Sequence, residues 1–304
     1  MITTGNYFLP HVNNEPYTEK PPLFFWLISA LSYPFGDVTP WTTRLPSVGA
    51  GLITLLFTWL MARRLFNARV AFWTCLILLT MQRFWWNARC GQIDMTLTAC
   101  LTVGLYGFLR FQEKRQLRWL PLFYLAAALG LYAKGPGVGV FPTLFILAWS
   151  WRQPDRCLHW IHIVVGMGCA VVLYGLWAVP AHFLTAQETQ AAAADTLTSN
   201  MFRHTIGRFL LGVSHANWPW YYLKTLPADW LPWTLFLPWT LIWTWRHRKD
   251  SESMHFLLCW IVPAFIFFTI ALGKRAVYLL PLFPAFAMLF AVSILELMDG
   301  DHAL

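Results

Sequence analysis

A charged pair beside two prolines is the part of the sequence best suited to chemistry. Glu19 and Lys20 lie in YTEKPPLFFWL, residues 17–27, and an apolar stretch begins directly after Pro21 and Pro22. Because hydrocarbon excludes unpaired charges, a lysine at the start of such a stretch is expected at a membrane surface. An ammonium group there can neutralise a phosphate. Lys20 is therefore a candidate for binding a phosphate carried by a lipid.

Other charged residues stand at the ends of apolar segments. Asp94 lies in CGQIDMTLT, Lys134 in AKGP, and Lys274 and Arg275 in GKRAVYLLPLFPA. We expect these strings to return to one side of the membrane, where cations and a few carboxylates could line a shallow cavity for a lipid phosphate and a polar headgroup. Each of the basic residues taken alone is equally consistent with a side chain that only reaches from a helix end to the headgroups.

The composition indicates the surroundings in which these residues act. Hydrophobic residues make up 58% and charged residues 12% of the 304, with 19 Trp and a mean hydropathy of +0.49. A soluble domain has about 25% charged residues, so the sequence predicts an all-α polytopic membrane protein. The net charge of +8 fits attraction to anionic lipids. Nucleic-acid binding is not expected, because no basic run outside the apolar segments is interleaved with stacking aromatics.

We expect about nine membrane spans, since roughly 17–25 apolar residues cross a bilayer. Leu23–Tyr33 is too short to cross and is expected to lie in the interface. Prolines inside the spans, Pro263 among them, are expected to kink the helices without breaking them. The predicted spans are Leu45–Ala62, Val70–Trp86, Met95–Phe111, Trp119–Ala133, Gly137–Trp151, His159–Val179, Trp230–Trp245, His255–Leu272 and Ala276–Leu297.

The basic residues between the spans predict the orientation. Short, Arg-rich connections that alternate along the chain are expected to face the cytoplasm, as in RRLFNAR at residues 63–69 and RHRK at residues 246–249. The opposite, outer side carries the charged strings described above and a longer segment, 181–229. That outer side is the candidate functional face.

Several of these strings resemble a known family. GNYFLPHVNNEPYTEKPPLFFWL, ARCGQIDMTLT, AKGP, RFLLGVSHANWPWYYL and GKRAVYLLPLFPA, spread over essentially the whole chain, are similar to glycosyltransferases of the protein-mannosyltransferase superfamily, which have the GT-C fold. They look particularly like the bacterial transferases that carry 4-amino-4-deoxy-L-arabinose from undecaprenyl phosphate to lipid A. The resemblance implies a single transmembrane glycosyltransferase domain over 1–304, with 181–229 as an outer-face loop region. It also implies the bacterial inner membrane, with the site facing the periplasm.

The resemblance implies roles for individual residues. Lys20 would bind the phosphate of the polyprenyl donor, with Tyr17 and Glu19 beside it. Glu19 and His215 would be the carboxylate and imidazole that hold a divalent metal, and zinc suits such ligands. A hydrogen-bonded histidine without a metal is equally consistent with this pair. The residues expected to contact phosphate or acceptor are Lys134, Arg208, Lys274, Arg275 and Tyr278.

The chain departs from the family pattern at its beginning. Members of the family begin with a first membrane helix and an outer loop with an acidic pair, and one of its aspartates is the general base. Met1 corresponds to a point beyond that loop, so the resemblance implies a truncated chain. Asp94 is then the remaining outer aspartate near the motifs that could act as the base.

The implied reaction transfers a sugar from a polyprenyl phosphate to a lipid acceptor such as lipid A. The leaving phosphate gains charge as the glycosidic C–O bond breaks, so Lys20 and the arginines would stabilise the transition state more than the ground state. A carboxylate would accept the proton of the acceptor. A nucleotide-binding string is not needed, and the sequence has neither GxGxxG nor a Walker motif.

Other functions remain open at this point. The chain could transfer another lipid-linked sugar to lipid or protein, it could transport or flip lipid-linked sugars, or it could be an inactive remnant. Transporters commonly have internal repeats and ionisable groups near the membrane midplane. The charges here stand at the span ends, which favours a transferase.

Overall fold

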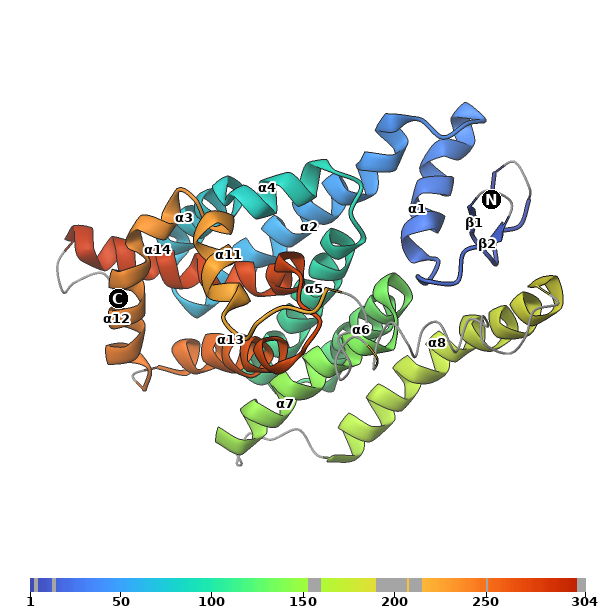
Figure 1. Ribbon diagram of the computed structural model, residues 1–304. Helices are drawn as coiled ribbons and strands as arrows, with labels where there is room; N and C mark the ends of the chain where they lie inside the picture. The colour runs from blue at the N-terminus through green and yellow to red at the C-terminus, as the bar shows by residue number, and fades with distance from the viewer. Residues whose placement is uncertain are drawn as a thin grey trace.

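The helices of the protein pack side by side in a bundle (Figure 1). The computed structural model describes residues 1–2, 5–12, 15–152, 160–189, 207, 215–249 and 251–299. Within these ranges the chain is helical apart from its connections and a short hairpin of two strands, in which His11 pairs with Pro16. The predicted all-α membrane fold class is confirmed.

Among the described residues, this hairpin is the largest sheet. In chain order they are β1 (His11–Val12), β2 (Glu15–Pro16), α1 (Leu23–Ser32), η1 (Tyr33–Phe35), α2 (Pro40–Leu65), α3 (Ala68–Thr80), α4 (Gln82–Arg89), α5 (Ile93–Lys114), η2 (Leu117–Trp119), α6 (Leu120–Lys134), η3 (Pro136–Gly139), α7 (Val140–Arg152), α8 (Trp160–Thr189), α11 (Tyr221–Asp229), η7 (Trp233–Phe236), α12 (Leu237–His247), α13 (Glu252–Ile270), η8 (Ala276–Leu282) and α14 (Phe283–Asp299).

Polar caps set the beginnings of several helices. Thr39 precedes α2, and its hydroxyl accepts a hydrogen bond from the backbone N–H of Thr42 at 3.2 Å while the Thr42 hydroxyl accepts from the N–H of Thr39 at 3.0 Å. Asn67 precedes α3 and accepts from the N–H of Val70 at 2.9 Å. Such caps satisfy backbone donors that a helix leaves unpaired in its first turn.

The core lies around α14 and α5. In the most apolar 18-residue stretch of η8 and α14, 89% of the residues are buried. α14 packs against α3, α12 and α13. α5 packs between α2 and α6. α8 lies at the edge of the bundle against α6 (Figure 1). In its most apolar 18-residue stretch, only 17% of the residues are buried. The exposed apolar faces of α8 are those of a helix that meets lipid.

The predicted span Val70–Trp86 is wrong as a single helix. The chain leaves helical geometry at Met81, so that α3 ends at Thr80 and a separate α4 begins at Gln82. The backbone N–H of Gln82 donates to the carbonyl oxygen of Leu231 at 3.1 Å. This contact from a distant segment replaces the intrahelical bond that a continuous helix would have made.

The structure does not confirm the predicted number of spans. In the described part of the chain, four helices are long and apolar enough to cross a membrane, or five if α4 and α5, bent by 111° relative to each other, form one broken span. Three further apolar helices are shorter: Leu23–Phe35, Ala68–Thr80 and Pro136–Trp151. The first of these agrees with the prediction that this stretch is too short to cross a membrane. The chain is a multi-pass membrane protein.

Two predicted spans and the predicted loop have different boundaries. The span expected at Trp230–Trp245 is a 3-10 turn, η7, followed by α12, and the last expected span begins with the 3-10 segment η8 before α14. The expected loop region 181–229 includes the end of α8 and all of α11. Most of the residues between these two helices lie outside the described ranges.

Candidate functional site

Three segments that are far apart in the sequence meet at one junction. Lys134, at the end of α6, forms an ion pair with Asp94 in the first turn of α5. The ammonium nitrogen of Lys134 also lies 4.4 Å from the centroid of the Tyr278 ring, which belongs to η8. The structure thus brings together the IDMT, AKGP and KRAVY strings. Their roles in binding or catalysis stay predictions.

The charges of this junction are largely shielded from water. The Asp94 side chain is 12% exposed and that of Lys134 is 21% exposed. Charges taken out of water to this degree are stable mainly because each has the other as a partner. The Tyr278 ring adds a cation–π contact to the ammonium group. A lipid phosphate reaching this point would compete with the Asp94 carboxylate for Lys134.

A close contact with α2 fixes the position of Asp94. The backbone N–H of Gln92 donates to the Ser47 hydroxyl at 2.8 Å, and this hydroxyl lies 3.2 Å from the Gln92 carbonyl oxygen, to which it donates. A side chain on Gly91 would place its Cβ 2.8 Å from the carbonyl oxygen of Thr43, so glycine permits this approach. α5 then starts with Asp94 in its first turn, where backbone N–H groups and the helix dipole favour a carboxylate.

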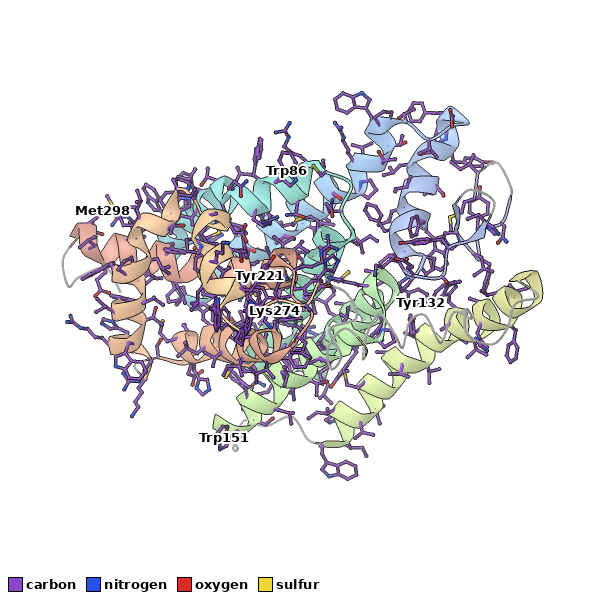
Figure 2. The ribbon with its side chains drawn as sticks, in the orientation of Figure 1. Trp86, Tyr132, Trp151, Tyr221, Lys274 and Met298 are labelled. Carbon is purple, nitrogen blue, oxygen red and sulfur yellow. The ribbon has the colours of Figure 1, made fainter. Side chains whose placement is uncertain are left out.

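Glycine and aromatic contacts fix the position of Lys134. Gly135 ends α6 with φ of 93°, a conformation that glycine adopts readily, and its N–H donates to the carbonyl of Leu131 at 2.7 Å. The Tyr132 ring lies 5.7 Å from that of Trp26 in α1, and its hydroxyl donates to the Leu173 carbonyl of α8 at 2.7 Å (Figure 2). The end of α6 that carries Lys134 is therefore attached to both α1 and α8.

The Lys20 segment is folded against the same helices. Lys20 and Tyr17 are half-buried and Glu19 is exposed. The Tyr17 ring meets the Phe25 ring of α1 edge-on at 5.7 Å. In the preceding residues, the Phe8 carbonyl accepts a hydrogen bond from the indole of Trp177 in α8 at 3.0 Å. Lys20 thus stands at the start of a helix that packs on the end of α6. Donor binding by Lys20 and Tyr17 stays a prediction.

Lys274 has a different environment from Lys134. Its side chain is 1% exposed, and its ammonium donates to the carbonyl oxygens of Asn217, at 3.1 Å, and of Ala271 (Figure 2). Burial lowers the pKa of Lys274. The neighbouring backbone pairs with the segment 215–217, with Ala216 opposite Gly273. Lys274 thus fastens a loop next to Tyr278 with two of the three N–H groups of its ammonium.

Of the remaining predicted residues, Arg275 and His215 lie in the segments that this contact joins. Arg275 is exposed, and its carbonyl accepts from the Tyr278 N–H at 3.0 Å. His215 is exposed, with a φ of 61° in the left-handed region. Arg208 lies outside the described residues.

Glu19 and His215 do not by themselves fit a metal centre. A zinc site takes at least three protein ligands. Over the described ranges, no group of three or more His, Cys, Asp or Glu side chains could hold a metal ion.

An ion pair that was not predicted from the sequence joins α4 to α11. Arg83 in α4 binds one carboxylate oxygen of Asp229, the last residue of α11, through Nη2 at 2.6 Å and Nε at 2.8 Å. Asp229 is 2% exposed, and its burial raises its pKa although Arg83 opposes this effect. The signal was available, because Arg83 fell inside a predicted span, where a charged side chain is expected to have a partner.

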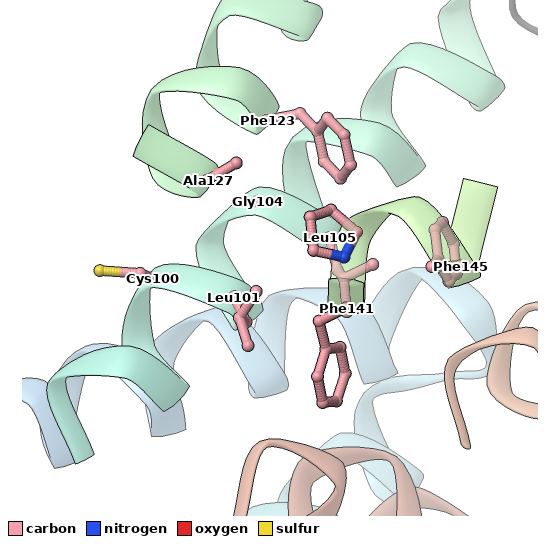
Figure 3. Close-up of a pocket in the computed structure, with 9 residues that line it drawn as sticks. Cys100, Leu101, Gly104, Leu105, Phe123, Ala127, Phe141 and Phe145 are labelled. Atoms are coloured by element: carbon pink, nitrogen blue, oxygen red, sulfur yellow. The ribbon is translucent and has the colours of Figure 1, made fainter. Parts of the chain in front are cut away.

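A small pocket lies between α5, α6 and α7 (Figure 3). Its lining includes Cys100, Gly104, Phe123, Phe141 and Phe145 and has no charged side chain. A phosphate or sugar headgroup needs charged or hydrogen-bonding partners. The junction of Asp94, Lys134 and Tyr278 is therefore the stronger candidate site.

Comparison with known sequences assigns the chain to a family. The sequence profile of the dolichyl-phosphate-mannose-protein mannosyltransferase family matches residues 19–177, just over half of the chain. The chain belongs to this family. The match includes the Lys20 segment, Asp94 and Lys134.

Curated relatives of this mannosyltransferase family member are about twice its length. The undecaprenyl phosphate-alpha-4-amino-4-deoxy-L-arabinose arabinosyl transferase of Pectobacterium carotovorum is 30% identical over 298 residues, which cover 96% of this chain and 52% of the relative. The enzyme of the same name from Aeromonas salmonicida is 29% identical, over 98% of this chain and 54% of its own. The chain thus spans about half the length of the curated relatives it matches.

Solved structures show the same fold. The crystal structure of ArnT from Cupriavidus metallidurans bound to undecaprenyl phosphate superposes with a TM-score of 0.81 at 23% identity, over 97% of this chain and 53% of that one. The Archaeoglobus fulgidus oligosaccharyltransferase in complex with Zn and sulfate gives a TM-score of 0.57 at 15% identity, over 96% of this chain and 42% of that one. At these identities the likeness concerns the fold, and it confirms the GT-C membrane fold predicted from the sequence.

Proposed function

We propose that residues 1–304 act as a transmembrane glycosyltransferase domain that transfers 4-amino-4-deoxy-L-arabinose from undecaprenyl phosphate to lipid A. The observation that carries this proposal is the meeting of Asp94, Lys134 and Tyr278, because it places a shielded carboxylate beside a cation at one surface of a membrane bundle. The names of the relatives supply the sugar, the carrier and the class of reaction. The outer, periplasmic face of the bacterial inner membrane is part of the proposal.

The junction can serve both halves of such a reaction. The acceptor oxygen attacks the anomeric carbon, the C–O bond to the undecaprenyl phosphate breaks, and its electron pair stays on the phosphate. Lys134 and Lys20 would stabilise the growing phosphate charge. Asp94 would accept the proton of the acceptor once Lys134 has turned to the phosphate. In this scheme the ion pair of the unliganded protein holds the Asp94 carboxylate and the Lys134 ammonium together until the donor binds.

A transfer assay tests the reaction. Membranes that contain the chain are supplied with undecaprenyl phosphate carrying labelled aminoarabinose, together with lipid A. We expect the label to move to lipid A, and Asp94→Asn to slow this transfer by about 10²-fold or more, the usual contribution of a general base. An equal rate for Asp94→Asn would remove Asp94 from the mechanism. Movement of the intact donor between leaflets without transfer would instead support a flippase.

Cysteine labelling tests the orientation. Asp94 is in the first turn of α5 and Lys114 in the last, about 30 Å apart along a helix of this length. In a background with the native cysteines replaced, Ala216→Cys should react with a membrane-impermeant maleimide in intact spheroplasts. Lys114→Cys should react only after permeabilisation. Ala216 and Lys114 are both exposed, so the opposite pattern would place the site on the cytoplasmic face.

A further inference from the structure

We propose that Arg83 and Asp229 are positioning residues, whose ion pair holds the helices on the two sides of the Asp94–Lys134–Tyr278 junction in one register. Neither residue belongs to the junction itself. The kinetic consequence of this inference rests on the proposed function, whereas its structural consequence does not.

Arg83 is connected to Asp94 through a short helix and a tight turn. It stands in the first turn of α4, which ends at Arg89. The chain then passes through the turn at 90–92, where Gln92 is fixed to Ser47, and enters α5 with the 111° bend. Because α4 is short and leads directly into the first turn of α5, a shift of α4 changes the position of Asp94.

Asp229 is connected to Tyr278 through the other partner helix. α11 follows the segment 215–217, which pairs with the backbone next to Lys274. Tyr222 in the first turn of α11 donates its hydroxyl to the carbonyl of Arg275 at 3.4 Å. Tyr278 donates its own N–H to that same carbonyl, at 3.0 Å. A shift of α11 therefore changes the backbone that carries Tyr278, and with it the ring that covers Lys134.

The ion pair between α4 and α11 therefore links the segment that leads to Asp94 with the segment that contacts the backbone of Tyr278. Two further hydrogen bonds join α4 and the end of α3 to the segment after α11, from the N–H of Gln82 to the Leu231 carbonyl at 3.1 Å and from the Trp233 indole to the Thr80 hydroxyl at 2.8 Å. These two bonds reach the segment after α11, whereas the ion pair joins α4 to α11 themselves and, being directional, fixes one alignment of the two helices.

Asp229 depends strongly on Arg83. Both nitrogen contacts of Arg83 go to Oδ1, whereas Oδ2 is buried and has no hydrogen-bond partner among the described residues. The Arg83 side chain is 31% exposed and could reach water without its partner. The two single substitutions should therefore differ: Arg83→Gln strands a buried carboxylate, whereas Asp229→Asn leaves a guanidinium that water can solvate.

Hydrogen exchange of the purified chain in lipid nanodiscs tests directly whether the Arg83–Asp229 ion pair holds the two segments in place. The probes are peptides that contain the amides of Gln92 and Lys274, which are hydrogen-bonded to the Ser47 hydroxyl and the His215 carbonyl. Arg83→Gln should speed exchange at both probes by about tenfold, as expected when local opening becomes easier. Asp229→Asn should have a smaller effect at both, and the double variant should exchange no faster than Arg83→Gln alone.

The control is an ion pair at the other end of α5. Arg64 of α2 binds Glu113 at 3.0 Å, with its side chain 37% exposed, and Arg64→Gln should change neither probe. Faster exchange confined to α4 and α11, with Gln92 and Lys274 unchanged, would show that the pair is only a local contact and overturn the inference. If Arg83→Gln fails to fold, the same comparison of exchange at the Gln92 and Lys274 amides is made with Asp229→Asn.

Kinetics then separates this inference from the proposed function. In the transfer assay, Arg83→Gln should lower kcat by about 10²-fold, the size of effect that a displacement of about 1 Å can have, and Arg83→Lys should recover part of it. A wild-type chain that transfers no sugar would count against the proposed function. The exchange result would still decide whether the Arg83–Asp229 ion pair positions the two segments. A wild-type rate for Arg83→Gln in an active protein would overturn its positioning role.

Discussion

Lys134→Met should abolish transfer and lower the free energy of unfolding by about 3–5 kcal/mol, the usual loss when one partner of a buried ion pair is removed. Methionine keeps most of the side-chain volume, so the effect comes from the Asp94 carboxylate, which is left 12% exposed without its ammonium partner. Chemical unfolding in detergent, followed by tryptophan fluorescence, measures the stability. The transfer assay measures the activity.

A double variant distinguishes stability from chemistry in this pair. Asp94→Asn combined with Lys134→Met removes both charges, so it should regain much of the stability that Lys134→Met loses but none of the transfer. Tyr278→Phe is the matched control, because it keeps the ring 4.4 Å from the Lys134 ammonium and should leave the stability near that of the wild type. A wild-type unfolding curve for Lys134→Met would show that the Asp94–Lys134 contact contributes little.

Lys20→Ala should weaken the binding of undecaprenyl phosphate by about tenfold to a hundredfold and leave the fold intact. A hydrogen bond to a charged group contributes about 1.5–3 kcal/mol, which corresponds to that range. The fold should persist because α1 is held by other contacts, such as Trp26 on Tyr132 and the Trp26 indole on the Tyr7 carbonyl at 2.7 Å. Native mass spectrometry with undecaprenyl phosphate measures the binding.

Two variants control this measurement. Lys20→Arg keeps the charge and should retain part of the affinity. Lys114→Ala removes an exposed lysine at the far end of α5 and should bind as the wild type does. Unchanged binding by Lys20→Ala would assign the phosphate to other cations of the site.

The sequence was sufficient for the fold class and for the meeting of three strings. Apolar segments of spanning length predicted an all-α membrane bundle, and charges at the segment ends predicted that Asp94, Lys134 and the KRAVY string would face one side. Both inferences rest on local properties: the length of an apolar segment and the place of a charge within it. Neither requires knowledge of which helix packs against which.

The sequence was insufficient where a distant segment decides the outcome. Val70–Trp86 is long enough to be one span, and its division at Met81 accompanies a hydrogen bond from Gln82 to Leu231 that no local pattern encodes. Lys134 and Lys274 both stand at helix ends, yet one meets a carboxylate and the other is enclosed by backbone carbonyls. Side-chain partners of this kind depend on the packing of segments well separated in the chain.

The 111° bend between α4 and α5 also bears on how the protein responds to membranes of different thickness. Trp85 and Trp86 of α4 are 43% and 52% exposed, and Arg89 lies over the Trp85 ring at 4.1 Å, an arrangement suited to the headgroup region. A helix resting there keeps the first turn of α5 at a constant depth. We therefore expect hydrophobic mismatch to be accommodated by tilt and by the opposite end of α5, with Asp94 kept at the same distance from the lipid headgroups in thin and thick bilayers.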